Sequence, residues 1–159
     1  MGTSWIARHV VAVAVVALAI AWTAAEGSSG LVASVSGMSN HTQVRIYDPS
    51  HRIATEVRTR DVLRGSARAM QDPAGNAAVF FRLTAEGASK FQTLTRALAH
   101  RGAKVHRNEH LAIQLGDFVS RPNIDYRLSP NGLSPKQGIE VLGMTISHAR
   151  RLAREIRQP

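Results

Sequence analysis

The stretch 110–121, HLAIQLGDFVSR, predicts a β-hairpin around which the other elements of the chain can be arranged. Apolar side chains alternate with small or polar ones over 110–115, as in a strand that buries one face. Gly116-Asp117 fits a two-residue hairpin loop, because glycine tolerates the positive φ required at the first loop position. The return strand covers 118–121, and Pro122 restricts it to an edge or an end of a sheet.

A strand and a helix are predicted directly before this hairpin. The apolar run 77–83, AAVFFRL, has the length of a strand. Thr84 is a good N-cap for the following helix, and Glu86 lies in its first turn, where negative charge is favourable. One face of the helix has the spacing of a buried stripe: Phe91, Leu94, Thr95 and Leu98. We expect the helix to end near Arg101, with Gly102 at the C′ position.

A loop, a strand and a second helix are predicted after the hairpin. The strand covers 138–142, and Thr145 caps the helix that follows it. The buried stripe of this helix consists of Ala149, Leu152, Ala153 and Ile156. Near the start of the chain, 44–47 alternates as a short strand, whereas 53–70 has no clear period.

The order of these elements predicts an α+β fold. Two helices cannot cover both faces of a long parallel sheet, but they can cover one face of a small, mostly antiparallel sheet. The chain has 159 residues and no long repeat, and about 115 of them, from Val44 onward, suffice for one compact core.

The first part of the chain has the composition of an export signal. An apolar run, VVAVAVVALAIAW, follows a short segment with one arginine and precedes small residues, so 1–25 is predicted to be a signal peptide or an uncleaved signal-anchor helix. Residues 26–43 read as a linker. We therefore expect the remainder to be extracytoplasmic, either anchored or secreted after cleavage. Because the chain has no cysteine, its stability must come from a core rather than from disulfides.

The charge balance is strongly basic, with a net charge of +9 and 17 arginines among the 20 basic residues. The clustered part lies on the last helix, at Arg150, Arg151, Arg154 and Arg157. A solvated helix face is one interpretation of this cluster, and contact with an anionic membrane surface is the other. Nucleic acid is not expected as a partner, because an exported protein rarely meets it and few aromatic residues are present to stack on bases.

No catalytic or cofactor-binding constellation is predicted. The stretch 106–110, HRNEH, matches the H-x-x-E-H zinc pattern, but that chemistry needs both histidines on one helical turn, and here a helix has just ended. We therefore expect no metal, no cofactor and no catalytic residues. A zinc hydrolase stays only as a third hypothesis. Asp117 and Asp125 fall in turns, where a bond to the local backbone is the expected role.

Three segments together resemble the SecD family of bacterial protein export. The helix opening TAEGA (84–88), with Phe91 and Thr95-Arg96, is similar to the SecD pattern T-P-E-G-A…F…T-R. HLAIQLGDFVSRPNID (110–125) resembles the hairpin of the same family. DYRLSPNGLSPKQGIEVLGMTISHARRLAREI (125–156) resembles its closing strand and helix, in the longer-loop form of some actinobacterial members.

This resemblance implies the extracytoplasmic head, part of the first periplasmic domain, over about 77–157, with a partial base-like region over 44–76. The chain departs from the family pattern at three points: Gly116-Asp117 replaces Asp-Gly, Ala85 replaces proline, and 140–143 replaces Gln-Ile-x-Gly. No second apolar span and no intramembrane acid follows, so we expect a stand-alone head that does not itself use proton flow.

The leading hypothesis from the sequence is therefore a non-enzymatic domain that binds unfolded exported polypeptide or a Sec translocase component. The return strand of the hairpin is the expected site, by strand addition. Its candidate residues are Phe118, Val119, Arg121 and Tyr126. The second hypothesis is a structural or membrane-surface module that uses the arginines of the last helix. The sequence leaves open the partner, the cleavage of the first segment and the oligomeric state.

Overall fold

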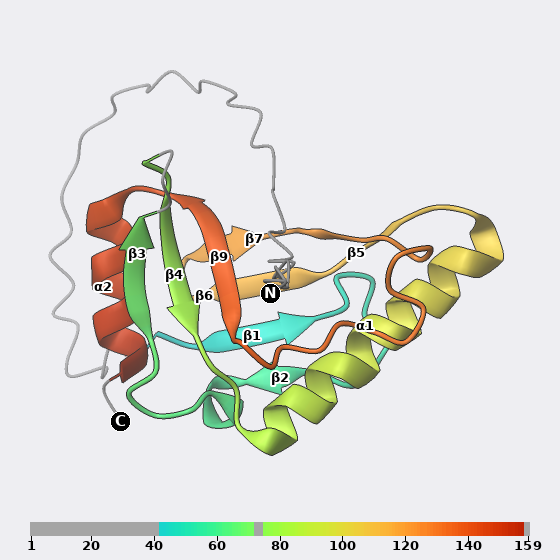
Figure 1. Cartoon of the computed structure of the whole chain (residues 1–159), viewed down its shortest axis with the longest axis horizontal. Helices are drawn as coiled ribbons and strands as arrows, with labels where there is room; N and C mark the ends of the chain where they lie inside the picture. The colour runs from blue at the N-terminus through green and yellow to red at the C-terminus, as the bar shows by residue number, and fades with distance from the viewer. Residues whose placement is uncertain (1–41, 72–74, 158–159) are drawn as a thin grey trace, which may run out of the picture.

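Two helices and nine short antiparallel strands make up the computed structural model, which describes residues 42–71 and 75–157 (Figure 1). The helices are α1 (Ala85–Val105) and α2 (Ile146–Arg157). The strands are β1 (Val44–Tyr47), β2 (Val57–Arg58), β3 (Arg68–Gln71), β4 (Ala77–Phe81), β5 (Glu109–His110), β6 (Ala112–Leu115), β7 (Phe118–Ser120), β8 (Asn123–Ile124) and β9 (Ile139–Met144). The predicted α+β class is confirmed.

The predicted hairpin forms one side of a four-stranded sheet with the order β2-β1-β6-β7. Leu115 at the end of β6 is in register with Phe118 at the start of β7, and Gly116 between them has a φ of 60°. A residue with a side chain is strained at such a φ, which explains the glycine. As predicted from Pro122, β7 is an edge strand.

The other strands form a three-stranded sheet, β3-β4-β9, and a two-stranded sheet, β5-β8. The three-stranded sheet crosses the four-stranded sheet at a steep angle (Figure 1). The sequence predicted one sheet, and this detail is corrected. β4, which contains the apolar run, pairs with β3 and β9 and not with the hairpin. Two sheets therefore form, and the apolar face of each sheet packs against that of the other.

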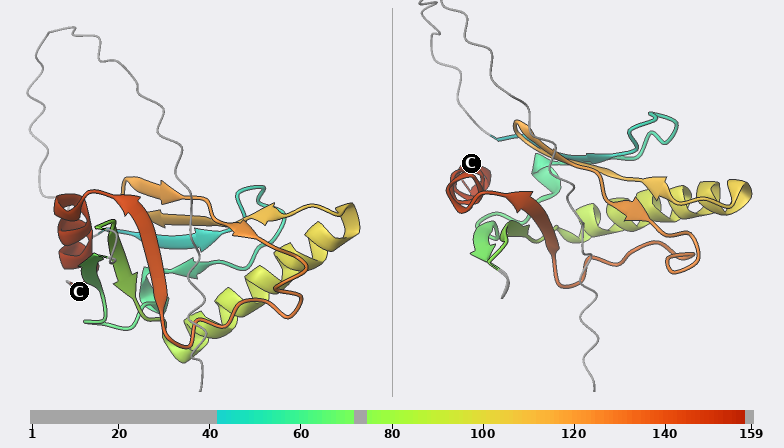
Figure 2. Two further views of the ribbon diagram at one scale, coloured as in Figure 1. Left: turned by 45° about the horizontal axis from the view of Figure 1, so that its top comes forward. Right: turned by 90° about the horizontal axis from the view of Figure 1, so that it is seen from above.

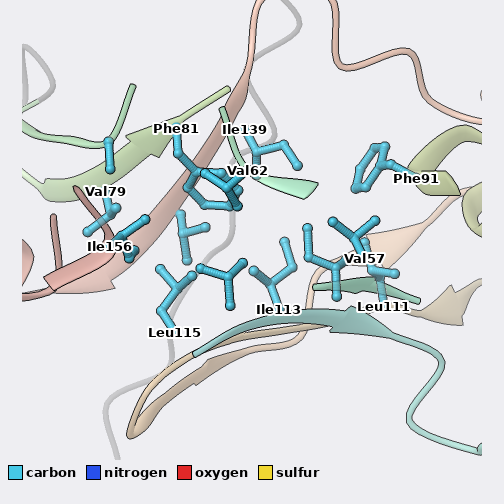
Figure 3. Packing of buried hydrophobic residues seen from close by; sticks show 14 of the residues in the cluster. Val57, Val62, Val79, Phe81, Phe91, Leu111, Ile113, Leu115, Ile139 and Ile156 are labelled. Carbon is cyan, nitrogen blue, oxygen red and sulfur yellow. The ribbon is translucent and has the colours of Figure 1, made fainter. Parts of the chain in front are cut away.

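The core lies between these two sheets and the helices (Figure 3). Ile113 and Leu115 of β6 point toward Val79 and Phe81 of β4, and Ile156 of α2 fills the space beside Val79. Phe81 and Leu115 have no exposed surface. Burying a large apolar side chain contributes roughly 1.5–3 kcal/mol, so this contact between the sheets is a main source of stability.

The first helix begins as predicted and ends later than predicted. The Thr84 side chain accepts a hydrogen bond from the backbone N–H of Gly87 at 3.1 Å. The helix continues past Gly102 to Val105, and His106 is the left-handed C-cap, with a φ of 52°. Gly102 is instead a site of close approach, because a Cβ there would lie 2.5 Å from the carbonyl oxygen of Arg107.

The second helix also follows its predicted cap, since the Thr145 hydroxyl accepts from the backbone N–H of His148 at 3.3 Å. Both helices lie on the same side of the four-stranded sheet (Figure 2, right). The predicted stripe of α2 is buried: Ala149, Leu152, Ala153 and Ile156. No helix in 42–71 or 75–157 is long and apolar enough to cross a bilayer.

The stretch 53–70, which had no clear period, forms two short strands and a 3-10 turn (Thr59–Asp61). The two predicted parts, 44–76 and 77–157, share one core, since β1 pairs with β6 and β3 pairs with β4. The predicted signal or anchor segment, 1–25, and most of the predicted linker, 26–43, lie outside the described residues.

Candidate functional site

The tip of the β6–β7 hairpin is held against α2 by charged side chains. Both carboxylate oxygens of Asp117 accept hydrogen bonds from the Arg151 guanidinium, each at 3.0 Å. These bonds lower the pKa of Asp117 below its usual value. The sequence predicted only a local turn role for Asp117, and this is corrected: its partner lies on a helix 34 positions away.

The edge strand β7 alternates between covered and exposed side chains. Phe118 is half-buried, and its ring meets the His148 ring edge-on, with centroids 5.9 Å apart. Val119 points the other way and keeps 44% of its surface exposed. Arg121, just after β7, is also exposed. Phe118 therefore belongs to the packing of the domain, whereas Val119 and Arg121 are accessible to a partner.

Tyr126 lies apart from β7, although the sequence grouped it with Phe118. The Cβ atom of Tyr126 lies 3.4 Å from the position of a Cβ at Gly102, so Tyr126 packs beside α1, whereas Phe118 faces α2. The Tyr126 hydroxyl accepts from the Arg127 guanidinium at 3.0 Å. Asp125 has the predicted local role, accepting from the backbone N–H of Arg127 at 2.8 Å.

The four clustered arginines of α2 divide into two groups. Arg151 is paired with Asp117 and, at 3.4 Å, with Glu155. Arg150, Arg154 and Arg157 line a surface cavity between α2 and β3, and no ion pair to a carboxylate in the described residues is made by these three. Only three of the four are therefore available to an anionic partner.

A buried ionic network that the sequence did not indicate joins β1 to α1. Asp48 follows β1 and has no exposed side-chain surface, and Arg101 of α1 donates to its two carboxylate oxygens at 2.7 and 3.0 Å. Arg101 also donates to Glu109 at 2.8 Å. The Asp-Pro-Ser turn after a strand was visible in the sequence, but nothing in the spacing marks a partner 53 positions away.

The same network places the residues of the HRNEH stretch. His106 caps α1, Glu109 starts β5 and accepts from Arg101, and His110 is the last residue of β5. The two histidines therefore do not share a helical turn, which the zinc chemistry requires. Within 42–71 and 75–157, no group of three or more histidine and acidic side chains is placed to hold a metal ion.

These observations define the class of protein: a small α+β domain in which two antiparallel sheets cross, with an edge strand and a basic helix. The chain is similar to two solved structures of SecDF. One is a super-membrane-facing form, at 25% identity over 64% of this chain and 12% of that chain. The other, described as a membrane component that enhances protein export, is 26% identical over 64% of this chain and 40% of that chain. The TM-score is 0.47 for both.

The matched part thus spans less than half the length of either SecDF chain. No family model matches the sequence, and no curated protein matches it.

Proposed function

We propose that this protein is a non-enzymatic, extracytoplasmic domain that assists Sec-dependent export by binding exported polypeptide or a Sec component. The proposal is supported by the resemblance of three sequence segments to SecD: the start of α1, the β6–β7 hairpin and the closing strand and helix. Under this proposal the chain is exported and is either anchored by its first segment or released. The region 44–76 would act as a base-like part and 77–157 as the head.

The observation that carries the polypeptide-binding role is the position of β7 at an open edge of the four-stranded sheet. An edge strand presents N–H and C=O groups that another extended chain can pair with. The exposed Val119 side chain would contact side chains on one face of the bound polypeptide, and Arg121 would place a positive charge next to this contact. β7 has only three residues, so the contact would be short and the binding weak and reversible.

Site-specific photo-crosslinking of the full chain tests this role. A photoreactive residue at Val119 or Arg121 is expected to crosslink to an unfolded exported polypeptide. The same residue at exposed Lys104, on α1, serves as the matched control. Equal yields at the three positions, or equal yields with a folded cytoplasmic protein, would contradict the proposal.

The alternative is a membrane-surface module, and it is favoured by Arg150, Arg154 and Arg157 on one side of α2, which form no ion pair with a carboxylate of the described residues. Each basic residue near an anionic surface contributes about 1 kcal/mol of attraction, which salt screens. Cosedimentation with phosphatidylglycerol vesicles is expected to fall with added salt and with Arg154→Gln. Arg151→Gln is the matched control on the same helix, since Arg151 is paired with Asp117. Binding that ignores salt, or that falls equally in both variants, argues against this alternative.

A further inference from the structure

Two adjoining cavities beside β3 form a basic groove. The larger has a volume of about 720 Å³, the smaller about 450 Å³, and both are lined by Arg68 and Arg157. Seven cationic side chains line the two cavities together, all of them exposed: Arg64, Arg68, Arg82, Lys136, Arg150, Arg154 and Arg157. No acidic residue among the described ones contributes to either lining. We call this surface the β3 groove.

The acids of the described residues lie outside the lining of the β3 groove. Seven of them pair with cations outside the β3 groove: Asp48, Glu56, Asp61, Glu86, Glu109, Asp117 and Glu155. Asp125 accepts from the backbone N–H of Arg127, and Glu140 of β9 is in register with Phe80 of β4; both acids lie outside the lining of the two cavities. Among the described residues no carboxylate forms an ion pair with the cations of the β3 groove, so these cations repel one another, and an anionic partner would relieve this repulsion.

The walls of the β3 groove are held by backbone and stacking contacts. The backbone N–H of Leu63 donates to the Arg82 carbonyl at 2.8 Å, and that of Arg82 donates to the Ser66 hydroxyl at 3.0 Å. The Arg68 guanidinium stacks over the Phe80 ring at 4.5 Å. Phe80 is also closely approached by Gly138, where an added Cβ would lie 2.5 Å from the ring. The cations are thus carried by a surface whose backbone is hydrogen-bonded and whose central ring is packed.

The β3 groove also contains an open strand edge. β3 is the outer strand of its sheet, so within 42–71 and 75–157 one side of its backbone has no strand neighbour. Arg68 and Ala69 of β3 line the smaller cavity together with residues of α2, which packs against β3, so β3 lies beside a cavity that is bordered by a helix. A strand edge beside a helix is a place where an extended peptide can add to a sheet.

We propose that the β3 groove binds an acidic segment of an extended polypeptide, which adds as a strand beside β3. The backbone of the segment pairs with β3, its carboxylates meet the arginines, and its apolar side chains contact Phe80 and Leu63, which is 41% exposed. Guanidinium groups suit carboxylates because they bind them in a bidentate manner. A membrane is the less suitable partner, because these cations line a concave surface and a bilayer presents no backbone groups to β3.

This inference is independent of the polypeptide-binding role proposed for β7, since it concerns the other sheet, although the β3 groove shares Arg150, Arg154 and Arg157 with the membrane-surface alternative. A short fluorescent peptide in which glutamate alternates with valine is the probe, and anisotropy with the full chain is the measurement. We expect binding that weakens with salt. Replacing the glutamates with glutamine should weaken it about tenfold or more, because the charge-assisted bonds are lost. N-methylation of alternate backbone amides should weaken it as strongly, because strand pairing is blocked.

The variant Arg64→Gln/Arg68→Gln is expected to bind the acidic peptide about tenfold more weakly. The matched control is Arg52→Gln/Lys104→Gln, which removes the same charge from exposed positions outside the β3 groove and should bind as the unaltered chain does. The N-methylated peptide needs no protein variant, so the test holds even where a variant folds poorly.

Equal weakening in the two variants would overturn the proposal, because it would show a non-specific charge effect. So would undiminished binding of the N-methylated or the glutamine peptide. Phosphatidylglycerol vesicles and inorganic polyphosphate form the remaining arms. Binding of either through Arg64 and Arg68, with no binding of the acidic peptide, would replace the polypeptide by a phosphate-bearing partner and would also overturn it. A crosslink at Val119 together with no acidic preference would leave the proposed function standing and remove only this inference.

Discussion

Arg101 and Asp48 are joined by two hydrogen bonds, at 2.7 and 3.0 Å, although 53 positions separate them in the chain. The Asp48 carboxylate also accepts from the Ser50 hydroxyl and from the backbone N–H groups of Ser50, Arg52 and Ile53. Burial alone would raise the pKa of Asp48, but the Arg101 and Ser50 bonds and the Arg101 charge outweigh it and hold this pKa well below its usual range. The pair fixes the turn after β1 against α1.

Asp48→Asn is expected to lower the free energy of unfolding by about 3 kcal/mol, because it leaves the partly covered Arg101 without its main partner. Urea unfolding followed by circular dichroism measures the change. Glu86→Gln is the control, because Glu86 is 74% exposed and should contribute little. A double variant, Asp48→Asn/Arg101→Met, should lose less than the sum of the two single losses. Strict additivity would show that the two residues do not act as a pair.

Stability is expected to fall with acid below about pH 4, because the buried carboxyls have depressed pKa values in the folded state. Burial alone would raise the pKa of Asp61 as well, but hydrogen bonds from Lys90 and from the Arg58 backbone outweigh it. Below the ordinary aspartate pKa of about 4, the unfolded chain takes up protons that the folded chain does not. The stabilisation is therefore complete above that pH and is lost as pH falls toward the folded-state values.

The urea midpoint between pH 5 and pH 2.5 is the measurement for this dependence. The Asp48→Asn variant should show a shallower decline than the unaltered chain, since it lacks one of the responsible groups. An equally steep decline would mean that other carboxyls dominate the acid response.

Gly102→Ala is expected to destabilise the protein by about 1–3 kcal/mol, although alanine in a helix interior is normally better than glycine by about 1 kcal/mol. The added methyl group would lie 2.5 Å from the carbonyl oxygen of Arg107, a backbone atom that cannot move without disturbing the helix end. Lys104→Ala, at an exposed position in the same turn, should change stability by less than about 0.5 kcal/mol. A Gly102→Ala variant with a higher free energy of unfolding than the unaltered chain would contradict the close approach of Gly102 and the Arg107 carbonyl.

Thr95→Val should lower stability by about 1–3 kcal/mol while keeping the shape of the side chain. The buried Thr95 hydroxyl accepts from the backbone N–H of Leu133 at 2.9 Å and donates to the Phe91 carbonyl at 2.9 Å. Valine would leave the Leu133 N–H without this partner and release the loop before β9 from α1. Thermal unfolding, with exposed Thr93→Val as the control, measures the effect, and equal losses in both variants would rule out this role of the bond.

The local elements could be predicted well from the sequence because their signals are local. The β6–β7 hairpin follows from alternation and one glycine, and both helix starts follow from Thr84 and Thr145. The predicted end of α1 was wrong because Gly102 allows the close approach of Arg107 and is not the left-handed cap. The sequence alone does not distinguish these two roles of a glycine.

Relationships between distant residues could not be predicted. Asp48 and Arg101 meet only because β1 and α1 pack together. β4 pairs with β9 because the tertiary packing of the two sheets places these strands side by side. Arg151 is paired, whereas Arg150 and Arg154 line a cavity, because Asp117 of the hairpin lies beside Arg151. The sequence of the helix alone does not contain this information. The candidate site was therefore anticipated as a hairpin edge and a basic helix, whereas the β3 groove, built from four separate segments, was not.

The pairing of β1 with β6 has a consequence for how the chain becomes folded. β1 lies inside its sheet, and Val44 is in register with Leu115 while Ile46 is in register with Ile113. β4 likewise lies inside its sheet, between β3 and β9, and Val79 is in register with Val141. Such a topology has a high contact order, so folding is expected to be slow, in the range of milliseconds to seconds. If the chain emerges N-terminus first, the four-stranded sheet cannot be completed before β7 has emerged, and the three-stranded sheet cannot be completed before β9. The chain would therefore stay unfolded until most of it has emerged.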